Sequence, residues 1–166
     1  MRKLFLFTGL SLILMLAACS SAESKEILEY HNAFVENVSD KMVALDQPYD
    51  HLENAATDKQ ALDIFDSEIL PAINEMKEYM DGQKLETEVA KEYHNMRLEW
   101  LNAWSEGNYM EKDALENYVN NSLTEDEMDK LMQQAESKYK KAQELDQKAN
   151  EKIDELADEY NFEEEE

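Results

Sequence analysis

Residues 124–160 have the sequence TEDEMDKLMQQAESKYKKAQELDQKANEKIDELADEY, in which apolar side chains recur at intervals of three and four. The set comprises Met128, Leu131, Ala135, Tyr139, Ala142, Leu145, Ala149, Ile153, Leu156 and Tyr160. These intervals place side chains on one face of an α-helix. Thr124 and Glu127 have the spacing of a capping box, so the helix is predicted to begin at Glu125. A helix from there to Tyr160 would be about 54 Å long at 1.5 Å per residue.

Three earlier segments show the same helical periodicity. Their apolar stripes are Ile27, His31, Phe34, Val38, Met42, Leu45, Tyr49 and Leu52; Leu62, Phe65, Ile69, Ile73, Met76 and Met80; and Leu85, Val89, Tyr93, Met96, Trp100, Ala103, Gly107, Met110, Ala114 and Tyr118. Four amphipathic helices joined by short connections predict an all-α fold, an up-down four-helix bundle with long, coiled-coil-like third and fourth helices. The pattern leaves open whether the second half of the last helix packs against the bundle or projects beyond it.

Two prolines fall within these helical segments. Pro48 predicts a bend or interruption near residues 46–47, because a proline cannot continue the helical hydrogen-bond pattern. Pro71 allows two interpretations: a kink, or two shorter helices that meet with Pro71 in the first turn of the second. Thr57 and Gln60 have the spacing of another capping box, which predicts a helix start at Asp58.

The charge balance limits the classes of partner. The 166 residues include 39 acidic and 16 basic side chains, for a net charge of −23. Such a surface excludes general binding to nucleic acid, whose affinity depends on lysine and arginine contacts to phosphate. It also disfavours docking to anionic lipid through charge. Glycine (3) and proline (2) are too scarce for a β-sandwich or barrel, which uses both residues in turns.

The N-terminal residues have the three parts of a bacterial lipoprotein signal. Arg2 and Lys3 are followed by an apolar run at 4–16, which is too short to span a membrane and suits a signal-peptide core. The run ends in Leu16-Ala17-Ala18-Cys19, which resembles the bacterial lipobox. The resemblance implies cleavage before Cys19 and lipid attachment to its sulfur, with acyl chains such as palmitate. A plain secretory signal with an incidental cysteine is the alternative.

This interpretation divides the chain into four parts: a lipoprotein signal peptide at 1–18, a lipid-anchored spacer at 19–24, a helical bundle domain at 25–161 and an acidic tail at 162–166. Cleavage removes two basic residues, so the mature chain has 14 basic against 39 acidic residues, a charge of −25. Acylation of Cys19 leaves no thiol for a disulfide, so the domain must be stabilised by its core. The predicted location is the extracytoplasmic face of the cell membrane, and the 13 lysines against one mature arginine, Arg97, favour a Gram-positive source.

One short motif occurs twice. Glu29-Tyr30-His31-Asn32 recurs as Glu92-Tyr93-His94-Asn95, 63 positions later, on the first and third predicted helices. These helices run parallel in an up-down bundle, so His31 and His94 could lie at one level and hold haem or a transition metal. Chance repetition in a biased composition is the simpler interpretation. The spacing Glu-x-x-His of di-iron bundles is absent, because Leu28 and Lys91 occupy the required positions.

Other chemistry finds less support in the sequence. The pairs Met76/Met80 and Met128/Met132 could bind copper through their thioethers, but methionine on an apolar stripe is usually core. The aromatic residues around Trp100 and Trp104 are likewise predicted to be core, and His51 is left without a role. No nucleophile elbow, glycine-rich phosphate loop, zinc motif or calcium loop occurs, so no catalytic residue, cofactor or metal is assigned and no enzyme is expected.

The predicted function is that of a non-enzymatic, acidic lipoprotein acting as an interaction or structural module of the cell envelope. Its helices resemble in style those of small uncharacterised Gram-positive lipoproteins, some described as cell-wall-binding. A basic envelope protein would be the favoured partner, since the charge would steer its approach. The alternatives are immunity to or sequestration of cationic peptides, and a metal or haem carrier built on His31 and His94.

Overall fold

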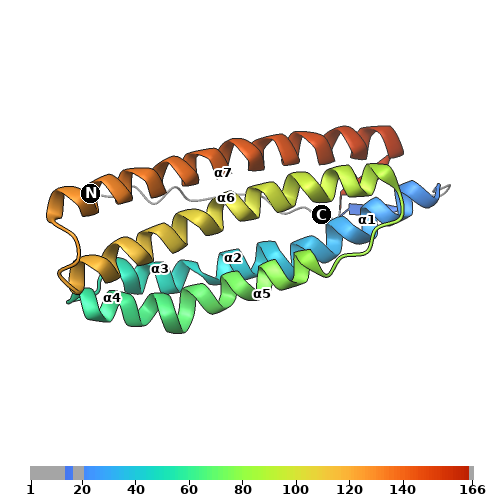
Figure 1. Ribbon diagram of the computed structural model, residues 1–166. Helices are drawn as coiled ribbons and strands as arrows, with labels where there is room; N and C mark the ends of the chain where they lie inside the picture. The colour runs from blue at the N-terminus through green and yellow to red at the C-terminus, as the bar shows by residue number, and fades with distance from the viewer. Residues whose placement is uncertain (1–13, 17–20, 165–166) are drawn as a thin grey trace.

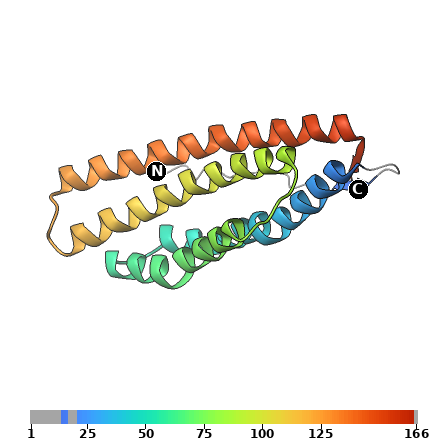
Figure 2. The ribbon, with the colours of Figure 1, turned by 45° about the vertical axis from the view of Figure 1, so that its right-hand side comes forward.

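The computed structural model describes residues 14–16 and 21–164, and this part of the chain is almost entirely helical. Four helical rods lie roughly side by side (Figures 1 and 2). The first comprises α1 (Ala22–Phe34), a π-helical turn η1 (Val35–Ser39), α2 (Asp40–Ala44) and α3 (Asp46–Glu53). The second comprises α4 (Asp58–Ile64), the π-helical turn η2 (Phe65–Ile69) and α5 (Leu70–Asp81). The third and fourth are α6 (Glu88–Val119) and α7 (Glu125–Tyr160). The all-α class and the four helical segments are therefore as predicted.

Contacts between side chains give the relative directions of the rods. Lys41 pairs with Glu75, and His51 lies 3.5 Å from Glu68, so the first two rods run antiparallel. Glu26 contacts Thr87 while Tyr49 contacts Asn108, so the first rod and α6 run parallel. Lys138 and Lys152 pair with Glu106 and Glu92, so α6 and α7 run antiparallel.

The core runs along the inner faces of all four rods. Its fully buried side chains include Ile27 and Val38 of the first rod, Ile73 and Met76 of the second, and Tyr93 and Leu101 of α6. From α7 it takes Ala142, Ala149, Ile153 and Leu156, which belong to the second half of that helix or border it. The second half of the last helix therefore packs on the other rods instead of projecting.

Both prolines lie in the first turn of a helix, where a missing amide hydrogen breaks no helical bond. Pro48 is the third residue of α3, and the interruption falls at Leu45, one residue earlier than predicted. Pro71 is the second residue of α5, directly after η2. The second predicted alternative is therefore confirmed: two shorter helices, α4 and α5, follow one another with Pro71 in the first turn of the second, and the π-helical turn η2 connects them.

Helix starts follow the predicted caps closely. At Thr124 both halves of the capping box are present, as predicted. At Thr57 the hydroxyl accepts from the Gln60 amide, but the Gln60 side chain accepts from Ala56 N–H, one residue before the position that a capping box requires. Ser21 caps α1, which begins at Ala22 and so takes in the last residues of the predicted spacer.

A short two-stranded antiparallel pair joins the ends of the described chain. β1 (Leu14–Leu16) pairs with β2 (Phe162–Glu164), with Leu16 opposite Phe162. The start of the predicted acidic tail is thus a strand, and Phe162 packs against the core and stacks on Tyr160. The remainder of the predicted signal peptide and Cys19 lie outside the described residues. Within 14–16 and 21–164, no helix is both long enough and apolar enough to cross a bilayer.

Candidate functional site

The two copies of the repeated motif lie against each other across α1 and α6. His31 Nδ1 lies 2.9 Å from Tyr93 Oη, and His94 Nδ1 lies 3.0 Å from Tyr30 Oη. Each histidine thus contacts the tyrosine of the other copy. The two tyrosine rings meet edge to face, with centroids 5.7 Å apart. Because α1 and α6 run parallel, the same four residues recur at the same height along the rods, and the side chains pair reciprocally.

Arg97 extends this cluster to α7. Its Nε donates to Tyr93 Oη at 2.9 Å, its Nη1 to Asp146 Oδ1 at 2.9 Å and its Nη2 to Asn150 Oδ1 at 2.8 Å. The guanidinium also lies over the Phe34 ring, 4.8 Å from its centroid. Arg97 is only 4% exposed. A buried guanidinium of this kind is tolerated because each of its three nitrogens donates a hydrogen bond and a carboxylate balances the charge. We call Tyr30, His31, Tyr93, His94 and Arg97 the tyrosine–histidine network.

Burial controls the protonation of the network. It raises the pKa of Tyr93 to about 12, although the neighbouring Arg97 guanidinium acts in the opposite direction. Burial also raises the pKa of Tyr30. It lowers the pKa of His94, an effect that Asp81 partly opposes. Neutral tyrosines and a neutral His94 are the forms that burial favours, because a charged group loses more hydration energy than a neutral one.

Asp146 is the counter-ion of Arg97. Burial raises the pKa of its carboxyl group, while the Arg97 guanidinium and a hydrogen bond from Asn150 lower it. The net effect is a raised pKa for Asp146, because its carboxyl group is mostly covered and loses hydration. The pair provides charge balance, with Arg97 Nη1 donating to Asp146 Oδ1 at 2.9 Å.

The repeat's glutamates do not belong to the network. Glu29 lies 3.6 Å from Lys25, and Glu92 lies 3.6 Å from Lys152, both on exposed surfaces. Among the described residues, no group of three or more His, Cys, Asp and Glu side chains is placed to hold a metal ion. The structure places His31 and His94 in one network, in which the Nδ1 atom of each contacts a tyrosine.

The remaining candidate residues fall elsewhere. Met76 and Met80 are fully buried in the core, and Met80 Sδ accepts a long contact of 3.7 Å from Tyr30 Oη. Trp100 and Trp104 are buried, in agreement with their interpretation as core residues. His51 is exposed beside Glu68, where it borders a shallow cleft of about 350 Å³.

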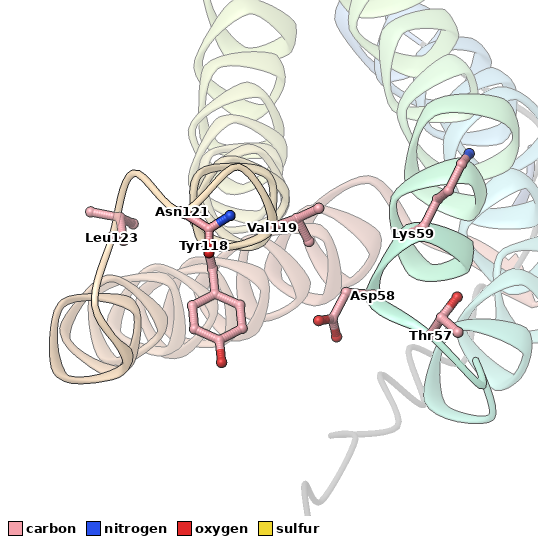
Figure 3. A pocket seen from close by; sticks show the side chains of 7 residues that line it. All are labelled: Thr57, Asp58, Lys59, Tyr118, Val119, Asn121 and Leu123. Carbon is pink, nitrogen blue, oxygen red and sulfur yellow. The ribbon is translucent and has the colours of Figure 1, made fainter.

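A second cleft of about 420 Å³ lies at the end of the rods formed by the α6–α7 connection and the start of α4 (Figure 3). Tyr118, Val119 and Leu123 border it from one side, and Asp58 and Lys59 from the other. The side chains in Figure 3 lie apart around an open space instead of converging on one point. Convergent polar groups are the mark of a small-molecule site, so this cleft gives no chemical assignment.

The sequence analysis did not assign three residues to the site. These are Arg97 and its two hydrogen-bond partners, Asp146 and Asn150. A signal for Arg97 exists, because it occupies a position on the apolar stripe between Tyr93 and Trp100. A lone charge on an apolar stripe requires a buried partner. Asp146 beside Leu145 could not be matched to it without knowing how α7 is aligned along α6.

Sequence reasoning also missed a cap made between rods. The Glu26 carboxylate of α1 accepts from the amides of Glu86 and Thr87 at 2.6 and 2.8 Å, and from the Thr87 hydroxyl. Thr87 itself caps α6 by accepting from Ala90 N–H. The threonine before Glu88 is a detectable cap signal, whereas the role of Glu26 follows only from the packing of α1 on α6.

Comparison with protein families, with curated proteins and with solved structures finds no significant match for this chain.

Proposed function

We propose that this protein is a non-enzymatic, lipid-anchored lipoprotein of the bacterial cell envelope, which acts as an interaction or structural module. The order of basic residues, apolar run and Leu16-Ala17-Ala18-Cys19 at the N-terminus supports lipid attachment at Cys19. Two acyl chains would provide a stable anchor, since each buried CH₂ contributes about 0.8 kcal/mol. The expected location is the extracytoplasmic face of the cell membrane.

We interpret the rods as an up-down four-helix bundle in which α6 and α7 form a coiled-coil-like pair. The directions of the rods support the first part of this interpretation. The second part is supported by Ala135, Ala142, Ala149 and Leu156, which are all buried and recur every seven residues. A strict seven-residue repeat keeps one seam of a helix against its partner.

The main observation in support of the proposed function is that α1 begins close to Cys19, at one end of the rods. Ser21, two residues after Cys19, caps α1 at one end of the molecule, and the α6–α7 connection at 120–124 lies at the opposite end (Figure 1). An anchor at Cys19 would therefore hold one end of the rods near the membrane. The other end would stand away from it by a distance comparable to α7, about 54 Å for 36 residues. A rod held in this way presents its sides and its far end to the envelope.

The distribution of charge favours a basic partner. Acidic residues outnumber basic ones in every rod: 8 against 2 in 22–53, 7 against 2 in 58–81, 7 against 3 in α6 and 12 against 6 in α7. Many of the lysines are already paired within the chain, such as Lys41 with Glu75 and Lys138 with Glu106. The surplus is thus spread over the whole surface. Such a field accelerates encounters with basic proteins or cationic peptides.

A test of the anchor uses Cys19→Ala in the full chain, with Ser20→Ala as the matched control. We expect labelled palmitate to be incorporated into the wild type and the control, and both to sediment with membranes. Cys19→Ala should lose the label and be released. Equal labelling or equal membrane retention of Cys19→Ala would contradict the lipid anchor at this residue.

A test of the partner class measures binding of the full chain to a lysine-rich helical peptide, with a glutamate-rich peptide of equal length as the control. We expect binding of the basic peptide alone, with a loss of affinity of about tenfold or more between low and high salt, because screening weakens contacts between exposed charges. If the basic peptide did not bind at low salt, or bound with an affinity that salt did not change, the proposal of a basic partner bound through surface charge would be contradicted. Stoichiometric metal in the purified protein, or a Soret band after haem addition, would instead favour the carrier function.

A further inference from the structure

The cleft at the α6–α7 connection is bordered by large apolar side chains that do not belong to the core. Tyr118 and Val119 are the last two residues of α6, and Leu123 lies in the connection. All three are half-buried, but within the described residues they are neither part of the core cluster nor packed against it. The Tyr118 ring extends from the ribbon toward the open space (Figure 3). We call these three residues the apolar wall.

The backbone on both sides of Asn121 holds the apolar wall in place. The amides of Asn121 and Ser122 donate to carbonyl oxygens in the last turn of α6, at 2.9 and 2.8 Å. With Asn121 in the left-handed region at φ 55°, these two bonds form a Schellman motif, which ends α6. The capping box of Thr124 fixes the other side of the connection. A surface held in this way loses little conformational freedom when a partner binds.

The opposite wall of the cleft is formed by the start of α4 and is acidic. Asp58 is exposed there, and among the described residues it takes part in no ion pair. Lys59 also borders the cleft, but its Nζ lies 3.2 Å from the Asp63 carboxylate, which offsets its charge. Figure 3 shows Asp58 across the open space from the apolar wall. A cation that enters the cleft would thus meet an unpaired carboxylate.

The whole end of the rods has an acidic surplus. Residues 50–66 and 112–130 include 11 acidic and 3 basic side chains. Two of the three lysines, Lys59 and Lys112, are paired with carboxylates of the chain. The field around the cleft therefore attracts basic groups and repels anionic ones.

These features suit a protein segment better than a small molecule. Polar groups do not converge in the cleft, as a small ligand requires. The cleft of about 420 Å³ has room for a large apolar side chain, and the apolar wall provides contacts for it. Burial of one such anchor supplies affinity, whereas the surrounding charges select its neighbours in the segment and speed the encounter.

We propose that the cleft is the docking site for a basic segment of a partner protein. The segment places one large apolar side chain against the apolar wall and a lysine or arginine beside Asp58. This inference rests on the proposed function, because it names the surface at which the basic partner binds. The cleft lies at the end of the rods opposite to the start of α1 (Figure 1), so an anchor at Cys19 would leave it facing the envelope.

The test uses two dye-labelled peptides of equal charge, in which lysine and serine residues flank either a central phenylalanine or a central serine. Binding to the full chain is measured by fluorescence anisotropy. We expect the phenylalanine peptide to bind about tenfold more tightly, because only this peptide buries an apolar side chain in the cleft. Val119→Ser/Leu123→Ser should reduce the preference to about twofold or less, since the apolar contacts are lost. Val43→Ser is the matched control and should keep the preference, because Val43 is exposed on α2, outside the cleft.

The role of the carboxylate is tested with Asp58→Asn. We expect about threefold weaker binding of both peptides at low salt, and a smaller difference at about 0.3 M salt, because screening weakens contacts between exposed charges. The matched control is Asp158→Asn, which removes an exposed acid near the end of α7, at the opposite end of the rods. It should leave the affinity for both peptides unchanged.

Amide NMR of the full chain gives a second readout that does not depend on variants. The phenylalanine peptide should shift the signals of residues 57–59 and 118–123 most. Equal affinity for the two peptides, a preference that survives Val119→Ser/Leu123→Ser, or signal shifts spread over all four rods would overturn the cleft as the docking site and leave the basic partner in place. If neither peptide bound at low salt, the basic partner would be contradicted together with the cleft.

Discussion

Arg97 is the residue on which the most contacts of the site converge. Its three donating groups face three different acceptors, Tyr93 Oη, Asp146 Oδ1 and Asn150 Oδ1, in the fork geometry of a guanidinium. A lysine would offer one nitrogen to acceptors in three directions. The arginine thus connects α6 to α7 while its flat face covers the Phe34 ring of α1.

Replacement of this side chain should be costly. We expect Arg97→Met to lower the free energy of unfolding by about 3–5 kcal/mol, because it leaves the Asp146 carboxylate covered and without a cation. The measurement is urea unfolding followed by circular dichroism. The control is Lys59→Met, which removes an exposed pair with Asp63 and should change stability by less than about 0.5 kcal/mol. If both variants lost a similar free energy of unfolding, the buried Arg97–Asp146 pair would stabilise the protein no more than an exposed pair does.

Glu26 illustrates a different role for a single side chain, as a cap supplied by a neighbouring helix. Burial acts to raise the pKa of its carboxyl group, but hydrogen bonds from the Thr87 hydroxyl and from the amides of Glu86 and Thr87 outweigh it and hold the pKa below the ordinary value. The carboxylate also lies at the N-terminal end of α6, where the helix dipole favours negative charge.

The cap leads to a prediction with a defined pH range. Glu26→Gln should cost about 1 kcal/mol at pH 7, as for the loss of a helix cap. A lowered carboxyl pKa means that the stabilisation is present above the ordinary value of 4.5 and disappears as the pH falls below it. Urea unfolding at pH 7 and pH 3.5 checks this. Glu29→Gln, one turn further along α1, should have little effect on stability at either pH. If Glu26→Gln lowered the free energy of unfolding equally at both pH values, the negative charge of Glu26 would not be the source of the stabilisation.

At the scale of the elements, the contact between α6 and α7 depends on small residues. The Ala135, Ala142 and Ala149 side chains of α7 are buried, and α6 contributes Gly107 and Ala114. Small side chains let the two helices approach closely over much of their length. The longer side chains then interdigitate beside this seam, as Tyr139 does above Gly107.

Gly107 is the point where this approach can be tested. A Cβ at this position would lie 2.6 Å from a Tyr139 ring carbon, and that ring is held by a hydrogen bond from its hydroxyl to Glu111. We expect Gly107→Ala to destabilise the protein by about 1–2 kcal/mol, since overpacking outweighs the gain in helix propensity. In the control Gly82→Ala, the added Cβ would lie 3.3 Å from the Glu78 carbonyl oxygen, so the change in stability should be much smaller. Stabilisation by Gly107→Ala would show that Tyr139 moves away freely.

The two halves of α7 differ in how much they contribute to the core. Ile153 and Leu156 are buried, whereas Leu131 near the start of the helix is only half-buried. Ile153→Ala should therefore cost about 2–4 kcal/mol and Leu131→Ala about 1 kcal/mol, as measured by urea unfolding. The reverse order would mean that the second half of α7 is detached in solution.

At the scale of the whole molecule, charge opposes compactness. Every rod has an acidic surplus, so the rods repel one another wherever their charges are not paired. The exposed ion pairs, such as Lys25–Glu29 and Lys59–Asp63, contribute little to offset this repulsion. Stability must come from the core and from the buried network.

This balance predicts the response to salt. Raising sodium chloride from about 10 mM to about 0.5 M should increase the thermal midpoint by several degrees, because screening reduces repulsion between exposed charges. The triple variant Glu99→Gln/Asp113→Asn/Glu136→Gln removes three exposed acids and should gain less from salt. Differential scanning calorimetry provides the measurement. A midpoint that falls with salt would mean that attractive pairs dominate the surface.

Much of the fold could be predicted because helix periodicity and caps are local properties. The limits of α7 follow from the Thr124 capping box and the stripe that ends at Tyr160, and both agree with the structure. The turn η2 could not be predicted, since a π turn adds a residue to the helix without a distinct sequence signal. Pro71 indicated only that the helical hydrogen-bond pattern must change near this position.

For the site, the sequence determined the two copies of Glu-Tyr-His-Asn and the parallel helices on which they would lie. It could not show that each histidine contacts the tyrosine of the other copy, because periodicity does not define the rotation of one helix against another. Only the tertiary structure brought Asp146 to Arg97 and Glu26 to the start of α6. Such contacts depend on how helices distant in sequence are aligned. The apolar pattern of each helix specifies which face is buried, whereas their packing specifies which polar groups meet.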